Sequence, residues 1–242
     1  MQPSSAEQRY LDELLAAMRG PCAECFNGGI GLGQPFTDEF RATLLIHHYF
    51  LKSPLATNSF EAAFIRAARA AGHTINQAPD GFRFWDVEID GRKVSLKSTA
   101  AAGLKENSLH ISKLCEAAWI QDMRGAAQRE DATKRLFADY ASKVASIIQF
   151  RLFKGRALYE MVEIPVALLK QVAAVPRAEF APDGPSIGIP VGKDPPDFTL
   201  KLDRSDAKIT LANINKSVCS VLGTWQLDDP KAFPDRQKTG SH

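Results

Sequence analysis

The sequence predicts an α/β protein with a mixed central β-sheet flanked by helices, followed by a β-rich C-terminal region. Up to residue 175, segments with helical spacing of apolar residues alternate with strand-like segments, in the order helix, hairpin, helix, strands. From residue 176 on, proline and glycine become frequent and the regular segments have strand character. We therefore expect a helical N-terminal region and core over residues 1–175. Residues 176–242 are expected to form a β-rich region of the same compact unit.

The composition is that of a globular protein without a membrane segment. The chain has 242 residues, 45% of them hydrophobic, and a formal net charge of +2, which is compatible with a nucleic-acid partner but does not indicate one. Its N-terminus lacks the apolar segment of a signal peptide, and no stretch approaches the length of a membrane-spanning helix. We expect a cytoplasmic protein with no membrane partner. The lone pair Cys22 and Cys25 lacks the further ligands of a zinc site, so we expect reduced, structural cysteines.

Three helices are expected in the N-terminal part of the chain. Apolar residues recur at helical spacing over residues 5–18, 37–52 and 59–71. Between the first two lies a glycine-rich segment, residues 26–35, that invites interpretation as a phosphate-binding loop. It follows no predicted strand and lacks the complete phosphate-loop pattern, so a flexible loop is the simpler interpretation.

Residues 82–99 are expected to form a β-hairpin with an Asp-Gly turn at its centre. Because side chains alternate along a strand, Asp86 and Glu88 share one face of the first arm, and Ser95 and Lys97 share one face of the second. The opposite faces are apolar and suit a core. The polar face then holds charges near the middle of a sheet, where burial is costly unless the charges are paired or hold a metal. An ordinary exposed hairpin could carry the same residues.

After the hairpin, the pattern predicts two helices, two strands and a short helix. The first helix is expected from about residue 111, where apolar residues recur at i, i+3, i+4 and i+7. A longer, polar helix follows over residues 124–145, and alternating apolar residues predict strands over residues 147–153 and 158–164. Pro165 then begins the short helix.

The C-terminal region is expected to consist of loops and strands. Residues 176–197 are rich in proline and glycine, so they hold one short strand at most. Strands are then expected over residues 198–202, 208–213 and 218–227, with a polar turn between the first two.

The hairpin resembles a known enzyme motif. Asp86, followed after a short gap by Ser95, Leu96 and Lys97, is similar to the signature of the PD-(D/E)xK nucleases, above all the type II restriction endonucleases. The resemblance covers residues 58–164 and implies a restriction-endonuclease-like core with Mg²⁺ as its cofactor. It implies that Asp86 and the backbone carbonyl of Leu96 bind the ion. It further implies that Lys97 orients or deprotonates the attacking water and stabilises charge on the phosphoryl oxygens.

The chain departs from the motif at Ser95, where the family has an acid, so another carboxylate is needed. Glu61 is similar to a helix glutamate that many members add to the site, although it could instead pair with a nearby arginine. Glu88 shares the face of Asp86 but lies about 7 Å farther along the strand. Glu116 is expected on the helix after the hairpin, and some restriction enzymes with Ser-x-Lys resemble that arrangement. We favour Glu116 over Glu88; the alternative is that Glu116 only pairs with Lys113.

Two polar segments are candidates for DNA contacts. The first follows the hairpin, and the second is the turn between the strands expected at 198–202 and 208–213. An arginine in that turn could read guanine bidentately, whereas a solvated hairpin tip is the alternative interpretation. The candidate residues are Lys105, Asn107, His110, Lys113, Arg204, Ser205, Asp206 and Lys208.

The resemblance implies a Mg²⁺-dependent type II restriction endonuclease that cuts double-stranded DNA at a short specific sequence. A homodimer is expected, because palindromic sites favour two-fold symmetric proteins. No nucleotide cofactor is expected. Two alternatives remain open: a DNA repair or junction-resolving nuclease of the same fold, and a non-catalytic DNA-binding protein with a nuclease-like core.

Overall fold

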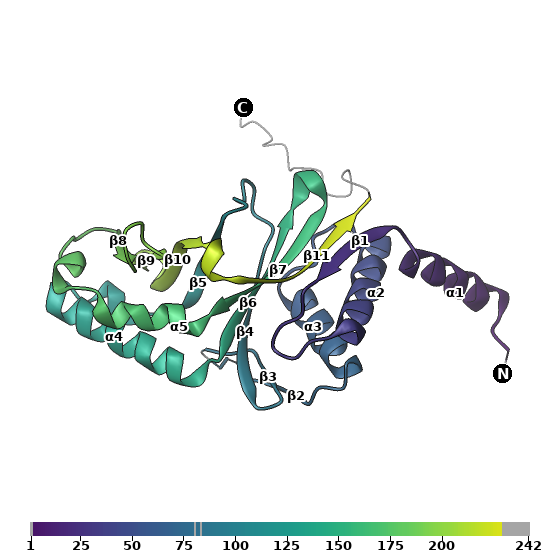
Figure 1. Cartoon of the computed structure of the whole chain (residues 1–242), viewed down its shortest axis with the longest axis horizontal. Coiled ribbons are helices and arrows are strands. Elements are labelled where there is room, and N and C mark those ends of the chain that lie inside the picture. Colours follow the sequence, from purple (N-terminus) through teal and green to yellow (C-terminus); the bar gives the residue numbers. More distant parts are fainter. Residues whose placement is uncertain (1, 80, 83, 229–242) are drawn as a thin grey trace.

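A mixed β-sheet forms the centre of the molecule. The computed structural model describes residues 2–79, 81–82 and 84–228. In these residues the central sheet has seven strands in the order β1-β11-β7-β6-β4-β3-β2 (Figure 1). Within the described part of this sheet, β4 and β6 are parallel and every other neighbouring pair is antiparallel. The strands are β1 (Cys22–Phe26), β2 (Ile75–Gln77), β3 (Val87–Ile89), β4 (Arg92–Thr99), β6 (Ser146–Phe153), β7 (Leu158–Pro165) and β11 (Ser220–Leu227).

A smaller antiparallel sheet lies beside the central one. Its four strands in the described residues have the order β5-β10-β9-β8. They are β5 (Ser108–Glu116), β8 (Ser186–Val191), β9 (Phe198–Asp203) and β10 (Lys208–Asn215). The chain after residue 176 therefore contributes to both sheets, since β11 returns to the central sheet between β1 and β7.

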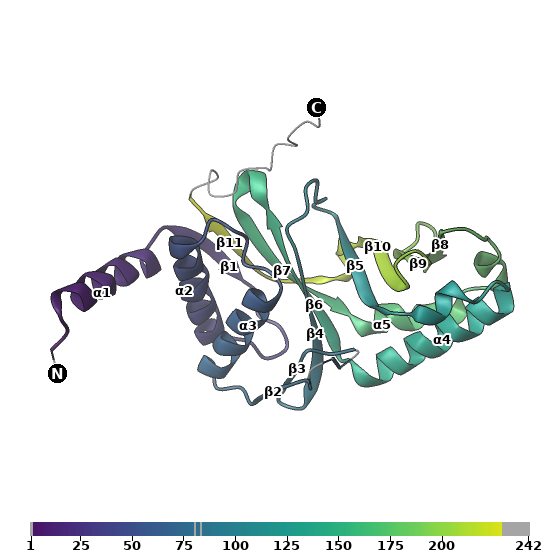
Figure 2. The ribbon, with the colours of Figure 1, turned by 180° about the vertical axis from the view of Figure 1, so that it is seen from behind.

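Helices cover the two sides of the central sheet. Helices α2 and α3 lie on one side, while α4 and α5 lie on the other with the smaller sheet (Figures 1 and 2). Helix α1 projects from the body, and none of its residues is buried. No helix among the described residues is long and apolar enough to cross a membrane. The helices are α1 (Ser5–Met18), α2 (Gln34–Phe50), α3 (Asn58–Ala70), α4 (Ala126–Lys143) and α5 (Val166–Leu169). Short 3₁₀ helices span Ala118–Gln121, Lys154–Arg156, Lys170–Ala174, Arg177–Phe180 and Lys216–Val218.

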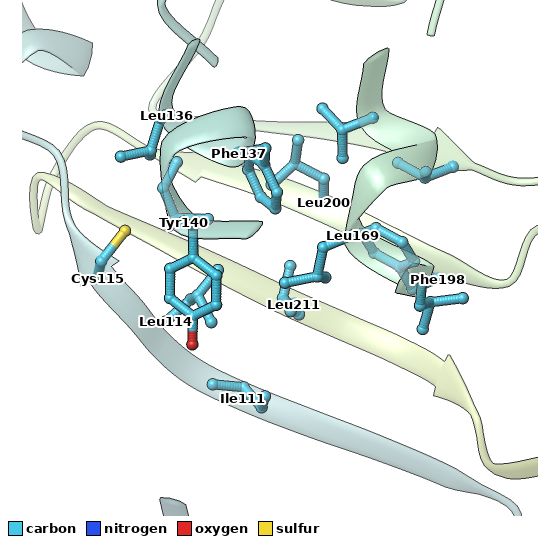
Figure 3. Packing of buried hydrophobic residues seen from close by; sticks show 14 of the residues in the cluster. Ile111, Leu114, Cys115, Leu136, Phe137, Tyr140, Leu169, Phe198, Leu200 and Leu211 are labelled. Atoms are coloured by element: carbon cyan, nitrogen blue, oxygen red, sulfur yellow. The ribbon is translucent and has the colours of Figure 1, made fainter. Parts of the chain in front are cut away.

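Two hydrophobic cores hold these layers together. The first joins α2 and α3 to the central sheet through aromatic rings: Phe60 of α3 stacks on Phe150 of β6 with ring centroids 4.8 Å apart, and Phe150 stacks on Tyr159 of β7 at the same distance. The second lies between α4, α5 and the inner face of the smaller sheet, where Phe137 and Leu211 pack (Figure 3). The sheet residues Lys97 and Gln149, paired between β4 and β6, are thus positioned by cores on both sides.

Most predicted elements are confirmed. The fold class, the three N-terminal helices, the hairpin, the long helix and the strands at β6, β7, β9, β10 and β11 all form, with ends shifted by a few residues. The hairpin turn has φ of +47° at Asp90 and +82° at Gly91, the left-handed conformation that this residue pair favours. The Asp90 carboxylate accepts hydrogen bonds from His73 Nδ1 (2.7 Å) and the Thr74 N–H (2.9 Å), and the His73 contact is the main cause of its lowered pKa.

The helix predicted from residue 111 is wrong, because this segment is strand β5. Its apolar residues alternate normally at Leu109 and Ile111. A β-bulge follows: Ile111 pairs with Leu211, but Cys115 already pairs with Ile209, so the inward-facing positions shift to Leu114 and Cys115. The resulting spacing imitates one face of a helix. The strands β1 and β2 were also not predicted.

Candidate active site

Asp86 lies beside an unpaired edge of strand β4. Strand β3 is short, and Val87 pairs with Val94 at its beginning, so β4 continues for several residues beyond its partner. The Asp86 N–H donates to the Val94 carbonyl at 3.0 Å, and the Asp86 side chain then takes the place of the missing strand. Its Oδ2 accepts a hydrogen bond from the Leu96 N–H at 2.6 Å. The length difference between the two arms therefore positions a carboxylate on the strand that carries Lys97.

Lys97 and Ser95 complete a compact polar cluster with Asp86. The Lys97 ammonium lies 3.4 Å from Asp86 Oδ2 and donates to Ser95 Oγ at 2.7 Å and to the Leu96 carbonyl at 3.1 Å. Ser95 Oγ donates to Asp86 Oδ2 at 3.2 Å. The side chains of Lys97 and Asp86 are 23% and 33% exposed, whereas Ser95 is fully buried. The side chains of Asp86 and Lys97 can therefore contact a ligand. Buried Ser95 cannot, but its hydroxyl hydrogen-bonds to both of them.

Asp86 and Lys97 line a pocket that also contains Glu61 of α3. This pocket has a volume of about 310 Å³ and lies between the beginning of α3 and the free edge of β4. The Thr57 N–H donates to Ser98 Oγ at 2.6 Å and thus fixes the start of α3 against β4. Arg66, one of the arginines close to Glu61 in the sequence, pairs with Glu39. The lining residues are Thr57, Asn58, Phe60, Glu61, Asp86, Leu96, Lys97 and Ser98.

Glu88 and Glu116 do not line this pocket. Glu88 faces strand β2, where Asn76 Nδ2 donates to its carboxylate at 3.2 Å. The prediction that Glu116 lies on a helix beside Asp86 is wrong, because Glu116 is the last residue of β5 in the smaller sheet. Its side chain is 77% exposed and accepts a hydrogen bond from Lys113 Nζ at 2.7 Å, as the alternative interpretation expected.

The pocket offers oxygen ligands suited to a hard cation. Its donors are the Asp86 and Glu61 carboxylates and the Leu96 carbonyl, and Mg²⁺ is typically held by one or two carboxylates while it keeps several waters. Among the described residues, no group of three or more His, Cys, Asp or Glu side chains is placed to hold a metal ion. Carboxylate and carbonyl oxygens are the type of ligand that Mg²⁺ takes, and they differ from the nitrogen and sulfur ligands of a typical structural zinc site.

The candidate DNA contacts fall into two places outside the pocket. Lys105 and Asn107 lie in the loop that joins β4 to β5, where buried Arg151 donates to the Lys105 carbonyl at 2.7 Å. His110 lies on β5, and burial, with Lys201 and Lys208 nearby, lowers its pKa. Two lysines from neighbouring strands thus lie near His110 on the smaller sheet, although Lys208 is also paired with Asp203. Lys201 is a residue that the sequence did not single out.

Arg204 and the polar turn are tied to the protein. The Arg204 side chain is 14% exposed and forms an ion pair with Asp183 at 2.6 Å, which lowers the pKa of Asp183. Lys208 pairs with Asp206 across the turn, and Ser205 lies between the two strands in that turn. Arg204 could contact a DNA base only after its ion pair with Asp183 is broken.

Related proteins are endonucleases. The family model described as SmaI, a type II site-specific deoxyribonuclease, matches residues 30–227. The chain is similar to the type II restriction enzyme SmaI of Serratia marcescens, with 27% identity over 200 residues and coverage of 78% of each chain. None of the solved structures gives a significant match. The matched region contains the whole of the polar pocket and both sheets apart from β1. This chain is an endodeoxyribonuclease that belongs to the SmaI family of type II site-specific deoxyribonucleases.

Proposed function

We propose that this enzyme uses Mg²⁺ to hydrolyse phosphodiester bonds at a short specific sequence of double-stranded DNA. The observation that carries the proposal is the cluster at the free edge of β4, where Asp86 and Lys97 approach to 3.4 Å beside the Leu96 carbonyl. The name of the Serratia marcescens relative, a type II restriction enzyme, supports a restriction function.

Asp86, Glu61 and the Leu96 carbonyl would hold the ion. Glu61 takes the role of the acid that the motif lacks at Ser95, because it lines the pocket while Glu88 and Glu116 do not. When bound, the ion supplies a Lewis acid and lowers the pKa of a coordinated water. The Asp86 carboxylate is held by the Leu96 N–H, so its position is set before the substrate arrives.

Lys97 supplies the positive charge nearest to the reacting phosphate. Its ammonium has three N–H donors, which now point to Asp86, Ser95 and the Leu96 carbonyl. Release of one of these partners lets Lys97 donate to a phosphoryl oxygen or to the attacking water. Such a donor stabilises the negative charge that develops in the transition state.

DNA contacts are proposed for the loop between β4 and β5 and for the smaller sheet. Lys105 and Asn107 lie in the loop, and His110, Lys113 and Lys208 lie on strands β5 and β10. Lysines contact phosphates without reading sequence, whereas the turn with Arg204, Ser205 and Asp206 offers groups for base edges. A homodimer would place two such surfaces and two pockets on a palindromic site.

Plasmid cleavage tests the proposal. Wild-type protein with Mg²⁺ is expected to give discrete fragments, and addition of EDTA stops the reaction. Lys97→Ala should abolish cleavage while the variant still melts cooperatively. The matched control is Lys170→Ala, which removes an exposed lysine on the 3₁₀ helix Lys170–Ala174 and should leave cleavage unchanged.

Other outcomes identify the alternatives. Cutting that depends on DNA structure and not on sequence indicates a repair or junction-resolving enzyme. A gel shift of duplex DNA without cleavage under any metal condition indicates a non-catalytic binder. Loss of cooperative melting in Lys97→Ala would make this lysine a structural residue and overturn its proposed role.

A further inference from the structure

A buried tyrosine packs against the segment that leads to Asp86. Tyr140 is in the last turn of α4 and its side chain is fully buried. Its ring makes an edge contact with Phe84, with centroids 5.3 Å apart, two residues before Asp86. Figure 3 shows the hydroxyl of Tyr140 at the end of the ring that points away from α4. Helix α4 therefore contacts the chain two residues before Asp86.

Ser95 and Asp86 of the cluster lie near the Tyr140 hydroxyl, together with Cys115 of β5. Burial raises the pKa of Tyr140, the Ser95 hydroxyl opposes this rise, and Cys115 and Asp86 add to it. Tyr140 is therefore protonated and can donate a hydrogen bond. In the described residues, its oxygen has no hydrogen bond that meets the usual distance and angle. A buried hydroxyl without a partner is uncommon and calls for an explanation.

Ser95 has one position left for such a donor. A serine hydroxyl offers one proton and two acceptor lone pairs. Its proton goes to Asp86 Oδ2 at 3.2 Å, and one lone pair accepts from Lys97 Nζ at 2.7 Å. One lone pair remains, and Ser95 is fully buried, so water cannot fill it from bulk solvent.

We propose that Tyr140 is a positioning residue whose hydroxyl donates to the remaining lone pair of Ser95. With this bond, Ser95 is fully satisfied and is fixed between Asp86 and Lys97. The serine that departs from the nuclease motif thus becomes the link between α4 and the two side chains that do the chemistry. The inference rests on the proposed function of Asp86 and Lys97.

A double-mutant cycle tests the link. Tyr140→Phe keeps the ring and removes the hydroxyl, and it is expected to lower kcat about fivefold to tenfold, the effect of one lost hydrogen bond. The KM for DNA should stay within about twofold, because the ground-state contacts with DNA are unchanged. In the Ser95→Ala background, Tyr140→Phe should have no further effect on kcat. The same non-additivity is expected in free energies of unfolding measured without metal.

Tyr159→Phe is the matched control. Tyr159 is also fully buried, and its hydroxyl accepts a hydrogen bond from the Leu55 N–H at 2.9 Å in the other core. This variant should lower stability, leave kcat unchanged and act additively with Ser95→Ala.

The inference would be overturned by a wild-type kcat for Tyr140→Phe. It would also be overturned if the reductions in kcat caused by Tyr140→Phe and Ser95→Ala multiplied in the double variant, or if Tyr140→Phe no longer melted cooperatively. Asp86→Ala separates this failure from failure of the proposed function. Cleavage by Asp86→Ala would refute the site itself. An inactive Asp86→Ala with a fully active Tyr140→Phe would refute only the role of Tyr140.

Discussion

Replacement of Asp86 by Asn and by Ala should separate its structural role from its chemical role. Asp86 Oδ2 accepts hydrogen bonds from the Leu96 N–H at 2.6 Å and from Ser95 at 3.2 Å, and Lys97 lies 3.4 Å away. An asparagine keeps an oxygen for the Leu96 N–H, whereas an alanine removes the acceptor altogether. A hydrogen bond to a charged group contributes about 1.5–3 kcal/mol. The partly exposed ion pair with Lys97 adds less than about 1 kcal/mol.

We therefore expect Asp86→Asn to lower the free energy of unfolding by about 1 kcal/mol and Asp86→Ala by about 2–3 kcal/mol. Both variants should lose Mg²⁺-dependent cleavage, because neither retains a carboxylate for the ion. Urea unfolding, followed by tryptophan fluorescence, measures the first quantity, and Trp85 next to Asp86 is a buried reporter. Plasmid cleavage measures the second.

Two results would refute this reasoning. Cleavage by Asp86→Asn near the wild-type rate would show that the charge of Asp86 is not needed for the reaction. Equal stability of the asparagine and alanine variants would show that the hydrogen bond to Leu96 does not hold the carboxylate in place.

Two further predictions concern the second acid and the pH dependence of folding. Glu61→Gln should lower the rate of cleavage at least about 100-fold, the usual scale for loss of a positioned charged group; Glu88→Gln and Glu116→Gln should cut normally, and an active Glu61→Gln would remove Glu61 from the site. Burial, with His47 nearby, lowers the pKa of His48 to about 4, below the usual value of 6.5. The neutral form is thus favoured in the folded state, so stability should fall as the pH drops from 6.5 through 4. In His48→Gln this part of the pH dependence of the melting temperature should disappear; an unchanged slope would contradict the assignment.

Local sequence patterns were sufficient to predict the structural features that depend only on neighbouring residues in the chain. The Asp-Gly turn and the alternation on either side of it predicted the hairpin, and the motif spacing placed Asp86 and Lys97 together. Both follow from backbone geometry over a dozen residues, with no knowledge of the rest of the chain. The strands β6 and β7 were predicted for the same reason.

Which carboxylate lies in the pocket with Asp86 could be seen only in the fold. Glu61 and Glu116 lie on opposite sides of the hairpin in sequence, and the pattern around Glu116 imitated a helix because of the bulge in β5. The pairing of β5 with β10, nearly one hundred residues later in the chain, placed Glu116 in the smaller sheet. The contact of Thr57 with Ser98 placed Glu61 in the pocket.

From the sequence alone, the α/β class, the hairpin with Asp86 and Lys97, and the departure from the nuclease motif at Ser95 could be predicted. The fold was needed to show which carboxylate lines the pocket with Asp86, where β11 inserts and which helix packs against the hairpin. Local patterns depend on the strand and helix periods, which a bulge can disguise. Strand pairing and the contact of Tyr140 with the hairpin depend on packing between segments far apart in the chain, and the sequence alone does not encode these in any short pattern.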